Sequence, residues 1–323
     1  MEKRILGFVL LLINGLMVEN QALAQGCSDA GFCTMGAMKP DQAFNKKVEL
    51  KLRSIEVSYY RGESTLSPMI NVANIDASFS ITKNLGVQIK LPYQWVTGNF
   101  DNTQGMGDIS LSATQRIIDN EKFDLNVTIG GKIPSNDGNM KSNGEVFKWS
   151  KGTPLPMYYQ TSLGSYDFVA GASIISSKWL FATGIQMALT ANSNQFEWSP
   201  DWDEYPDPEY VRKYDHANDL KRGTDIMFRI ERNFRFSNYS FNIGLLPIYR
   251  ITKDQIKEPE TGEYEKVDKT TGLALTALTS FTYNMDVNNS IKLSYGHKIT
   301  DREVNPDGLT RVQVFIVAYG FRF

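Results

Sequence analysis

Four sulfur-bearing residues near the N-terminus are the first candidates for chemistry: Cys27, Cys33, Met35 and Met38. Thiolates and thioethers are soft ligands, so together they could hold copper(I). The two thiols, with five residues between them, could instead close a local disulfide in an oxidising compartment. A disulfide would remove the two best metal ligands. We therefore expect a Cys27–Cys33 bond and no bound metal.

The only histidines, His216 and His297, decide whether the chain could be a hydrolase. A histidine base needs a nucleophile or an acid within hydrogen-bond reach. On an extended strand His297 shares its face with Tyr295 and Ile299, and no serine lies at that spacing. Asp215 beside His216, in an acidic stretch, is a weak pair. We expect a protein that is not an enzyme and has no cofactor.

Charged residues of both signs recur at alternate positions of extended stretches. A strand shows alternate residues on one face, so these charges would share the face opposite an apolar one. Two interpretations stay open: a lattice of paired charges that fills a narrow interior, or a solute path lined by both signs. The candidate lumen residues are Glu49, Lys51, Arg53, Asp76, Lys90, Asp108, Arg116, Asp124, Lys132, Arg229, Glu231 and Lys292.

Twelve such stretches follow one another along the chain. In the first, the alternation slips by one residue between Leu52 and Ile55, which predicts a β-bulge. The clearest hairpin turns at Lys83-Asn84. The expected strands lie at 48–59, 74–82, 85–95, 107–116, 123–133, 157–175, 179–190, 223–235, 239–251, 270–284, 290–300 and 310–323.

Short and long connections alternate between these strands. The short turns lie near 83–84, 118–121, 176–178, 236–238 and 285–289, and the long loops near 61–68, 98–106, 134–156, 191–222, 252–269 and 301–309. Short turns at one end and long loops at the other are typical of outer-membrane barrels. The pattern predicts an all-β fold: a transmembrane antiparallel up-and-down β-barrel of about 12 strands, with short periplasmic turns and long extracellular loops.

The last strand carries an apolar face to the end of the chain, formed by Phe315, Val317, Tyr319, Phe321 and Phe323. Such a face on a soluble edge strand would recruit other chains, whereas in lipid it is required. Aromatic residues at the last, third-last and fifth-last positions resemble the C-terminal assembly signal of outer-membrane barrels. The resemblance implies the barrel-assembly machinery as a partner.

The N-terminus predicts export. Lys3 and Arg4 precede an apolar run from Ile5 to about Met17, and Ala22-Leu23-Ala24 fits a signal-peptidase site. We expect a signal peptide at 1–24, a periplasmic extension or lumen plug at 25–45, and the barrel at 46–323. The expected location is the outer membrane of a Gram-negative bacterium.

Composition excludes some partners. With 34 basic and 36 acidic residues the formal charge is −2, so no field points to nucleic acid. Beyond the N-terminus no apolar run reaches the length of a membrane-spanning helix. The 18 Phe, 15 Tyr and 5 Trp suit the aromatic girdles of a barrel.

Two further stretches have open interpretations. Gly164 and Ser165 interrupt an expected strand, either as plain irregularity or as a kink that opens the wall sideways. The loop from Ala191 to Arg222 mixes tryptophans and tyrosines with carboxylates. It is by default a solvated surface loop, but it could take Ca²⁺, bridge lipopolysaccharide through divalent ions, or gather an apolar solute.

Two segments carry a family resemblance. Gly105-Met106-Gly107-Asp108-Ile109 is similar to a Gly-x-Gly-Asp motif, and Leu163 to Gly171 to a Gly-Ser-aromatic-Asp segment. Both belong to outer-membrane transporters assigned to the meta pathway of phenol degradation, within the superfamily of fatty-acid and hydrophobic-compound channels. The match extends over about 100–323 in spacing, and the extension from Cys27 to Met38 is outside the family pattern.

The resemblance implies passive uptake of small hydrophobic or aromatic compounds. The alternative is a closed-lumen barrel that acts as a binding or structural protein through its extracellular loops. The expected partners are outer-membrane lipid, lipopolysaccharide, the assembly machinery and a small-molecule solute.

Overall fold

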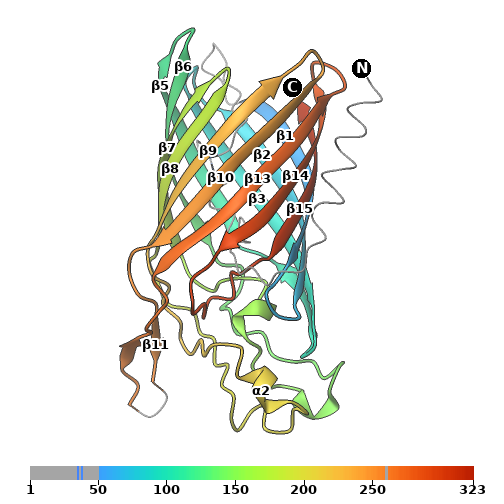
Figure 1. Cartoon of the computed structure of the whole chain (residues 1–323), viewed down its shortest axis with the longest axis vertical. Helices are drawn as coiled ribbons and strands as arrows, with labels where there is room; N and C mark the ends of the chain where they lie inside the picture. The colour runs from blue at the N-terminus through green and yellow to red at the C-terminus, as the bar shows by residue number, and fades with distance from the viewer. Residues whose placement is uncertain (1–34, 36–37, 39–50, 259–260) are drawn as a thin grey trace.

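The chain folds into a closed antiparallel β-barrel (Figure 1). The computed structural model describes residues 35, 38, 51–258 and 261–323. Strand β1 (Lys51–Glu63) pairs with β2 (Met69–Ser80) on one side and with β15 (Gln313–Arg322) on the other. Closure matters because backbone groups in lipid must find their hydrogen bonds inside the protein.

The barrel wall has twelve strand positions, as the alternation pattern predicts. One position is occupied by two strands in succession, because β4 (Asn102–Met106) and β5 (Ile109–Asp119) both pair with β3 (Leu85–Thr97). The remaining strands are β6 (Phe123–Ile133), β7 (Asp167–Ser176), β8 (Trp179–Ala188), β9 (Asp225–Arg235), β10 (Tyr239–Arg250), β13 (Gly272–Asn284) and β14 (Asn289–Thr300).

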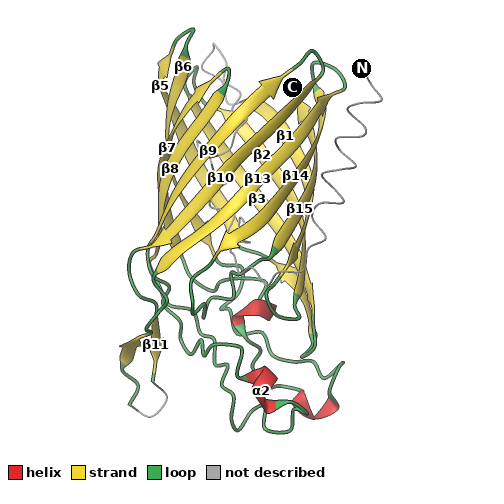
Figure 2. Cartoon of the chain, viewed as in Figure 1, coloured by secondary structure: helices red, strands yellow, loops and turns green. Residues whose placement is uncertain are grey.

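Connections sort by length, which confirms the prediction. The short ones, 81–84, 120–122, 177–178, 236–238 and 285–288, lie at the end that holds the C-terminus, the upper end in Figure 1. The long ones lie at the other end. Figure 2 shows that the short helices belong to the long loops: η3 (Lys148–Ser150), η4 (Met157–Tyr159) and α2 (Pro208–Val211).

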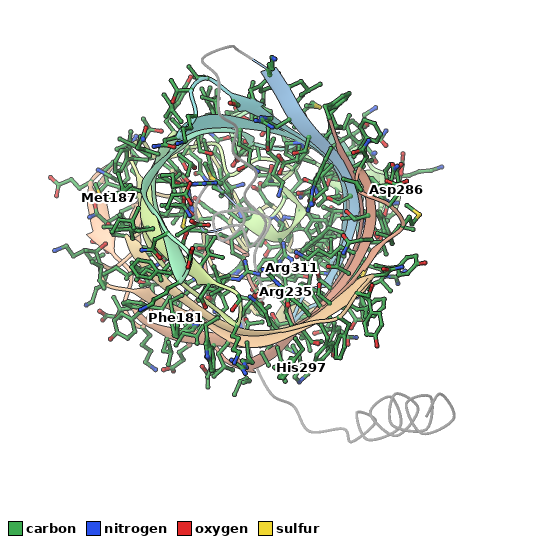
Figure 3. All side chains as sticks on the ribbon, turned by 90° about the horizontal axis from the view of Figure 1, so that it is seen from above. Phe181, Met187, Arg235, Asp286, His297 and Arg311 are labelled. Atoms are coloured by element: carbon green, nitrogen blue, oxygen red, sulfur yellow. The ribbon has the colours of Figure 1, made fainter. Side chains whose placement is uncertain are left out.

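The outer wall is apolar. Val317 of β15 lies between Tyr59 of β1 and Leu293 of β14, and each of these side chains is at least 41% exposed. Seen from the short-turn end, Phe181 and His297 lie outside the wall while Arg235 lies within its outline (Figure 3). A band of exposed apolar side chains on a closed barrel is a lipid-facing surface. Among the described residues, no helix is long and apolar enough to cross a membrane.

The sequence predicts most strand positions, with two kinds of difference. The bulge is confirmed, because the β1–β2 register shifts between Leu52 and Ser54. Residues 157–166, expected as strand, are the short helix η4 followed by loop, and residues 310–312, also expected as strand, are loop. Conversely, two expected loops contain strand: β4, and the hairpin of β11 (Gln255–Lys257) and β12 (Tyr264–Lys266). In each case the segment contacts other loops, and the alternation of residues along a strand does not predict such contacts.

The lipid-facing assignment is testable at Val317. We expect Val317→Lys to lower the free energy of unfolding by about 2–4 kcal/mol, because a charge would face hydrocarbon. Urea titration followed by heat-modifiable gel mobility measures this. The control is Ser290→Lys, which places the same side chain in the water-accessible interior. Equal losses for both variants would contradict the assignment.

Candidate functional site

The long-loop end of the barrel is closed by a layer of packed loops, here called the cap. Its centre is Phe100, which is fully buried. Around Phe100 stand five aromatic rings, Tyr159, Trp202, Tyr205, Tyr210 and Tyr214, with centroid distances of 4.5–5.9 Å. Phe100 and these rings come from three different loops. Aromatic packing of this kind stabilises beyond the area it buries.

The cap rests on an apolar collar at the loop end of the lumen. The collar consists of inward-facing side chains of β1, β2, β3 and β15: Tyr60, Ile70, Val72, Val96 and Val314. Ser67 holds the cap from the side, since its hydroxyl lies 3.2 Å from the hydroxyls of Tyr159 and of Tyr214. The interior is thus sealed towards the long-loop side.

The acidic and aromatic loop from 191 to 222 is partly buried in the cap. The default interpretation of that stretch as a solvated surface loop is wrong for its aromatic members, because Phe196, Trp202 and Tyr214 are at most 1% exposed. The apolar rings bury against each other, while most carboxylates of the stretch stay at the surface.

An ion lattice fixes the cap to the strand ends. Arg250, at the end of β10, contacts Asp225, Asp254 and Asp307 at 2.7–2.9 Å. Arg302 contacts Asp307 at 3.2 Å. All these side chains are at most 13% exposed. Buried charges must be paired to be tolerated, so the lattice ties two loops to the ends of β9 and β10.

Asp307 is the carboxylate most dependent on this lattice. Burial alone would raise its pKa, but the positive charges of Arg302, Arg250 and Arg222 outweigh burial and hold the pKa well below its usual range. Asp254 shares Arg250, and there burial prevails and raises the pKa. Asp307 is therefore the carboxylate that the arginines hold in its ionised form.

A second ion pair lies where β7 begins. Arg222 contacts Asp167 at 2.6 Å, and Asp167 lies opposite Lys132 of β6. Asp108, between β4 and β5, accepts hydrogen bonds from the Ser162 hydroxyl at 2.5 Å and from the Leu163 backbone N–H at 3.3 Å. This carboxylate thus positions a loop and does not line an open path.

An apolar cluster lies on one side of the lumen wall at mid-height. This apolar sector consists of inward side chains from five adjacent strands, β7 to β10 and β13: Val169, Ala182, Met227, Leu246, Ile248 and Leu278. Met35 and Met38 pack against it, at 2% and 0% exposure. The Met38 carbonyl also accepts a hydrogen bond from Arg229 at 3.4 Å. The part of the N-terminal segment that the structure describes thus lies inside the barrel.

The opposite half of the wall, on β2 to β6, is polar. Gln88 donates to Asp76 at 2.6 Å, and the Thr114 and Thr128 hydroxyls lie 2.7 Å apart. Deep in this polar sector, the Asn126 amide and the Lys132 ammonium are buried without a hydrogen-bond partner among the described residues. Such groups can bind a polar solute or water, because leaving them unpaired is costly.

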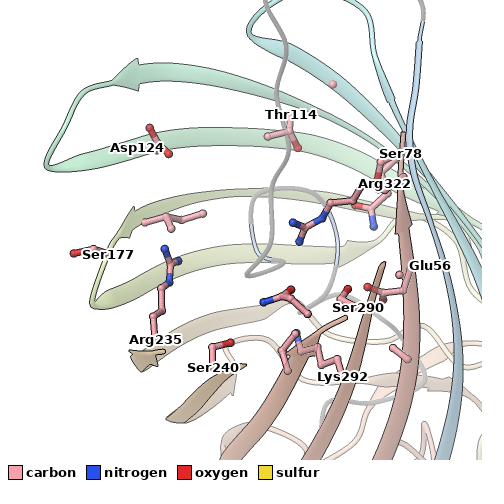
Figure 4. Close-up of a pocket in the computed structure, with 18 of the residues that line it drawn as sticks. Glu56, Ser78, Thr114, Asp124, Ser177, Arg235, Ser240, Ser290, Lys292 and Arg322 are labelled. Atoms are coloured by element: carbon pink, nitrogen blue, oxygen red, sulfur yellow. The ribbon is translucent and has the colours of Figure 1, made fainter. Parts of the chain in front are cut away.

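A vestibule of about 610 Å³ opens the lumen at the short-turn end (Figure 4). Arg235, Lys292 and Arg322 line it from β9, β14 and β15, and Glu56 and Asp124 line it from β1 and β6. Serine hydroxyls lie between them. Its wall is polar and carries both signs of charge.

The candidate lumen residues occupy several levels of the interior. Lys51 lies opposite the inward Ser80, and Arg53 is at the bulge. Asp76 and Lys90 are directly opposite on β2 and β3. Arg229 contacts Glu231 at 2.5 Å, and Arg116 contacts Asp119 at 2.7 Å. Asp124 and Lys292 line the vestibule. Glu49 lies outside the described residues.

Gly164 and Ser165 were expected to interrupt a strand, as an irregularity or as a kink, and this placement is wrong. Both residues precede β7 and belong to the cap-side loop. Gly164 has φ +70°, and a Cβ there would overlap the Asp137 carbonyl, so the glycine serves a tight loop contact. Ser165 donates to Asp167 at 2.9 Å. The β6–β7 pairing begins at Lys132 and Asp167 and continues unbroken to Phe123 and Ser176.

Other expectations fall outside the described residues or remain predictions. The signal peptide, Cys27 and Cys33 lie outside the described ranges. Within those ranges, no group of three or more His, Cys, Asp or Glu is arranged to hold a metal ion. His297 faces outward, 3.3 Å from the Tyr295 hydroxyl, and His216 packs on Trp198.

Inspection of the sequence missed the ion lattice and the aromatic cap. Asp167, Asp225 and Arg250 could have been found, since each holds an inward position where its strand meets a long loop. Asp254, Arg302 and Asp307 belong to loops and follow no strand periodicity. Their partners are set by tertiary contacts alone.

Solved structures with a similar shape are outer-membrane barrels. The NanC porin has a TM-score of 0.46 at 8% identity, covering 84% of this chain and 99% of that chain. The KdgM porin has 0.42 at 10%, with the same coverage. The CymD monoaromatic hydrocarbon channel has 0.41 at 10%, covering 94% of this chain and 95% of that one. The sequence matches no protein-family model and no curated relative. With TM-scores below 0.5, the strand pairing itself establishes the fold.

The ion lattice predicts how the cap responds to acid. A depressed pKa means that Asp307 stabilises the cap fully above about pH 4, the ordinary aspartate pKa, and that this contribution is lost as the pH falls further. Asp307→Asn should remove that acid-dependent part and loosen the cap by about 3–5 kcal/mol, because Arg250 and Arg302 lose a buried partner. Tryptophan fluorescence and protease cleavage of the loops measure this.

The matched control is Asp268→Asn, which removes an exposed carboxylate paired with Lys253. We expect this variant to keep the wild-type cap. If both variants opened the cap equally, or if Asp307→Asn left it intact, the lattice would not be what holds the loops.

Proposed function

We propose that the chain is an outer-membrane channel for the passive passage of small molecules that combine an apolar part with a polar group. The observation that carries this proposal is the apolar sector inside the barrel. If the inward side chains only filled the lumen, they would be expected to be charged residues paired with one another. Here, an apolar cluster that adjoins the Arg229–Glu231 ion pair faces a wall of hydroxyls and amides, which suits a solute with an apolar part and a polar group.

The position of Met35 and Met38 supports a role of the N-terminal segment as a plug. Burial of a methionine side chain contributes about 1.5–3 kcal/mol, so the two contacts together are weak enough to be displaced. A solute that competes for the apolar sector would replace them. On this proposal, the segment at 25–45 covers the path until a solute arrives.

Passage also requires the cap to move. The vestibule already gives access from the short-turn side, and the cap lies between the apolar sector and the long-loop side. In this proposal the long loops face outward, near lipopolysaccharide, and the outward aromatics Tyr319, Phe321 and Phe323 present β15 to the assembly machinery.

A second candidate function is a closed-lumen barrel that binds a ligand or partner through its loops. The observation that favours it is the cap, with its buried aromatic core and ion lattice. Loops that open often would be expected to bury less aromatic surface and fewer ion pairs.

Single-channel recording separates the two candidates. We expect the refolded mature protein to show little ion conductance, and the form without residues 25–45 to show discrete steps because the plug is gone. Adding Asp307→Asn to the shortened form should raise the open probability, since it loosens the cap. No steps from any of the three forms, with folding confirmed by heat-modifiable mobility, would favour the closed barrel.

Selectivity tests the apolar sector itself. In the shortened form, Leu246→Asn should lower the permeability of benzoate relative to acetate by roughly fivefold, because a benzene ring loses part of its apolar wall. Reversal potentials measure the ratio. Ser280→Asn, an inward change on the neighbouring β13, is the control. An unchanged benzoate ratio in Leu246→Asn would leave the apolar sector without a role in passage.

A further inference from the structure

A second cavity lies at the outer tip of the cap, away from the lumen. It has a volume of about 200 Å³ and lies between residues 197–203, helix α2 and His216. A cavity of this size holds a group of a few heavy atoms, so it fits a small solute or one head of a larger one. The lumen function does not use it.

Two indole rings line this cavity, and both are held rigidly. Trp198 donates its ring N–H to the Tyr214 carbonyl at 2.7 Å. Trp202 donates its ring N–H to the Pro154 carbonyl at 3.1 Å and stacks on Phe100. Trp202 is only 1% exposed and forms the floor of the cavity. Trp198 is partly exposed and its N–H group is already used, so it offers a ligand its π surface. Such surfaces attract cations.

Carboxylates at the rim add negative charge. Glu197 and Asp203 line the cavity, and neither forms an ion pair with any described residue. Glu197 accepts a hydrogen bond from Asn218 at 3.4 Å, and Asp203 accepts one from Ser199 at 2.9 Å. Burial, together with the negative charges of Asp201 and Glu258, raises the pKa of Glu197. A bound cation would relieve that repulsion.

His216 completes the cavity as an uncharged ring. Its ring lies 4.0 Å from that of Trp198, and its Nε2 atom is buried without a hydrogen-bond partner among the described residues. Burial lowers its pKa, so at neutral pH the ring is uncharged and adds no positive charge that would repel a cation.

The charge balance excludes an anion. Arg212 also lines the cavity, but it is exposed to solvent, and the stretch from 197 to 216 carries seven acidic residues against two basic ones. A metal ion is disfavoured because the described residues offer no group of three ligands. An organic cation can use both the π surfaces and the carboxylates.

We propose that the cavity between Trp198, Trp202, Glu197, Asp203 and His216 binds a small soluble organic ammonium cation. The face of Trp198 holds the alkyl groups and the charge, and the carboxylates balance the charge. Since the cavity is at the outer tip of the cap, it is accessible from the long-loop side whether or not the lumen conducts.

Titration of the refolded full chain with choline tests the site. We expect saturable quenching of tryptophan fluorescence by choline, and much weaker binding of its uncharged carbon isostere. The double variant Glu197→Gln, Asp203→Asn should weaken choline binding by roughly tenfold, because the ammonium loses its counter-charges. Sodium chloride at equal ionic strength controls for screening.

The matched control is Glu204→Gln, which removes an exposed carboxylate of the same loop that does not line the cavity. It should change choline affinity less than twofold or so. Equal binding of the isostere, no saturation by choline, or equal losses in the control and the double variant would each overturn the proposal. Unchanged heat-modifiable mobility shows that every variant has folded.

Discussion

Closure of the β1–β15 seam is the constraint on which the rest of this structure depends. In hydrocarbon, every strand N–H and C=O must pair within the protein, and only a closed ladder provides this. Once the ladder closes, alternate residues divide strictly into an outside and an inside. Val317 then faces lipid and Ala318 faces the lumen because they are neighbours in one strand. All further chemistry takes place within that narrow interior.

The two ends of the barrel differ because their connections differ in length. Short turns cannot cover an opening, so a polar vestibule remains there. The long loops carry tryptophans and tyrosines, which are unfavourable in water and far from lipid. They bury each other around Phe100, and the Arg250 lattice holds them to the wall. The cap therefore covers the long-loop end of the lumen and also positions the side chains of the cavity at its outer surface.

Between the apolar collar and the polar vestibule, the two sides of the interior differ at mid-height. Strands β7 to β10 and β13 supply apolar side chains together with the Arg229–Glu231 ion pair, and β2 to β6 supply hydroxyls, amides and Lys132. This division also explains how two methionine side chains of the N-terminal segment can pack there against apolar neighbours. A uniformly charged lumen would have offered them no place.

The sequence by itself determined the barrel. Period-two alternation, the slip after Leu52, the aromatic face ending at Phe323 and the sorting of loop lengths are local patterns, and the strand pairing follows them. Only the tertiary structure decided what the loops do. Gly164 marks a tight loop contact and not a kink, and Asp307 finds Arg250 across many intervening residues. Loops have no period, so their partners depend on distances in space that sequence spacing does not encode.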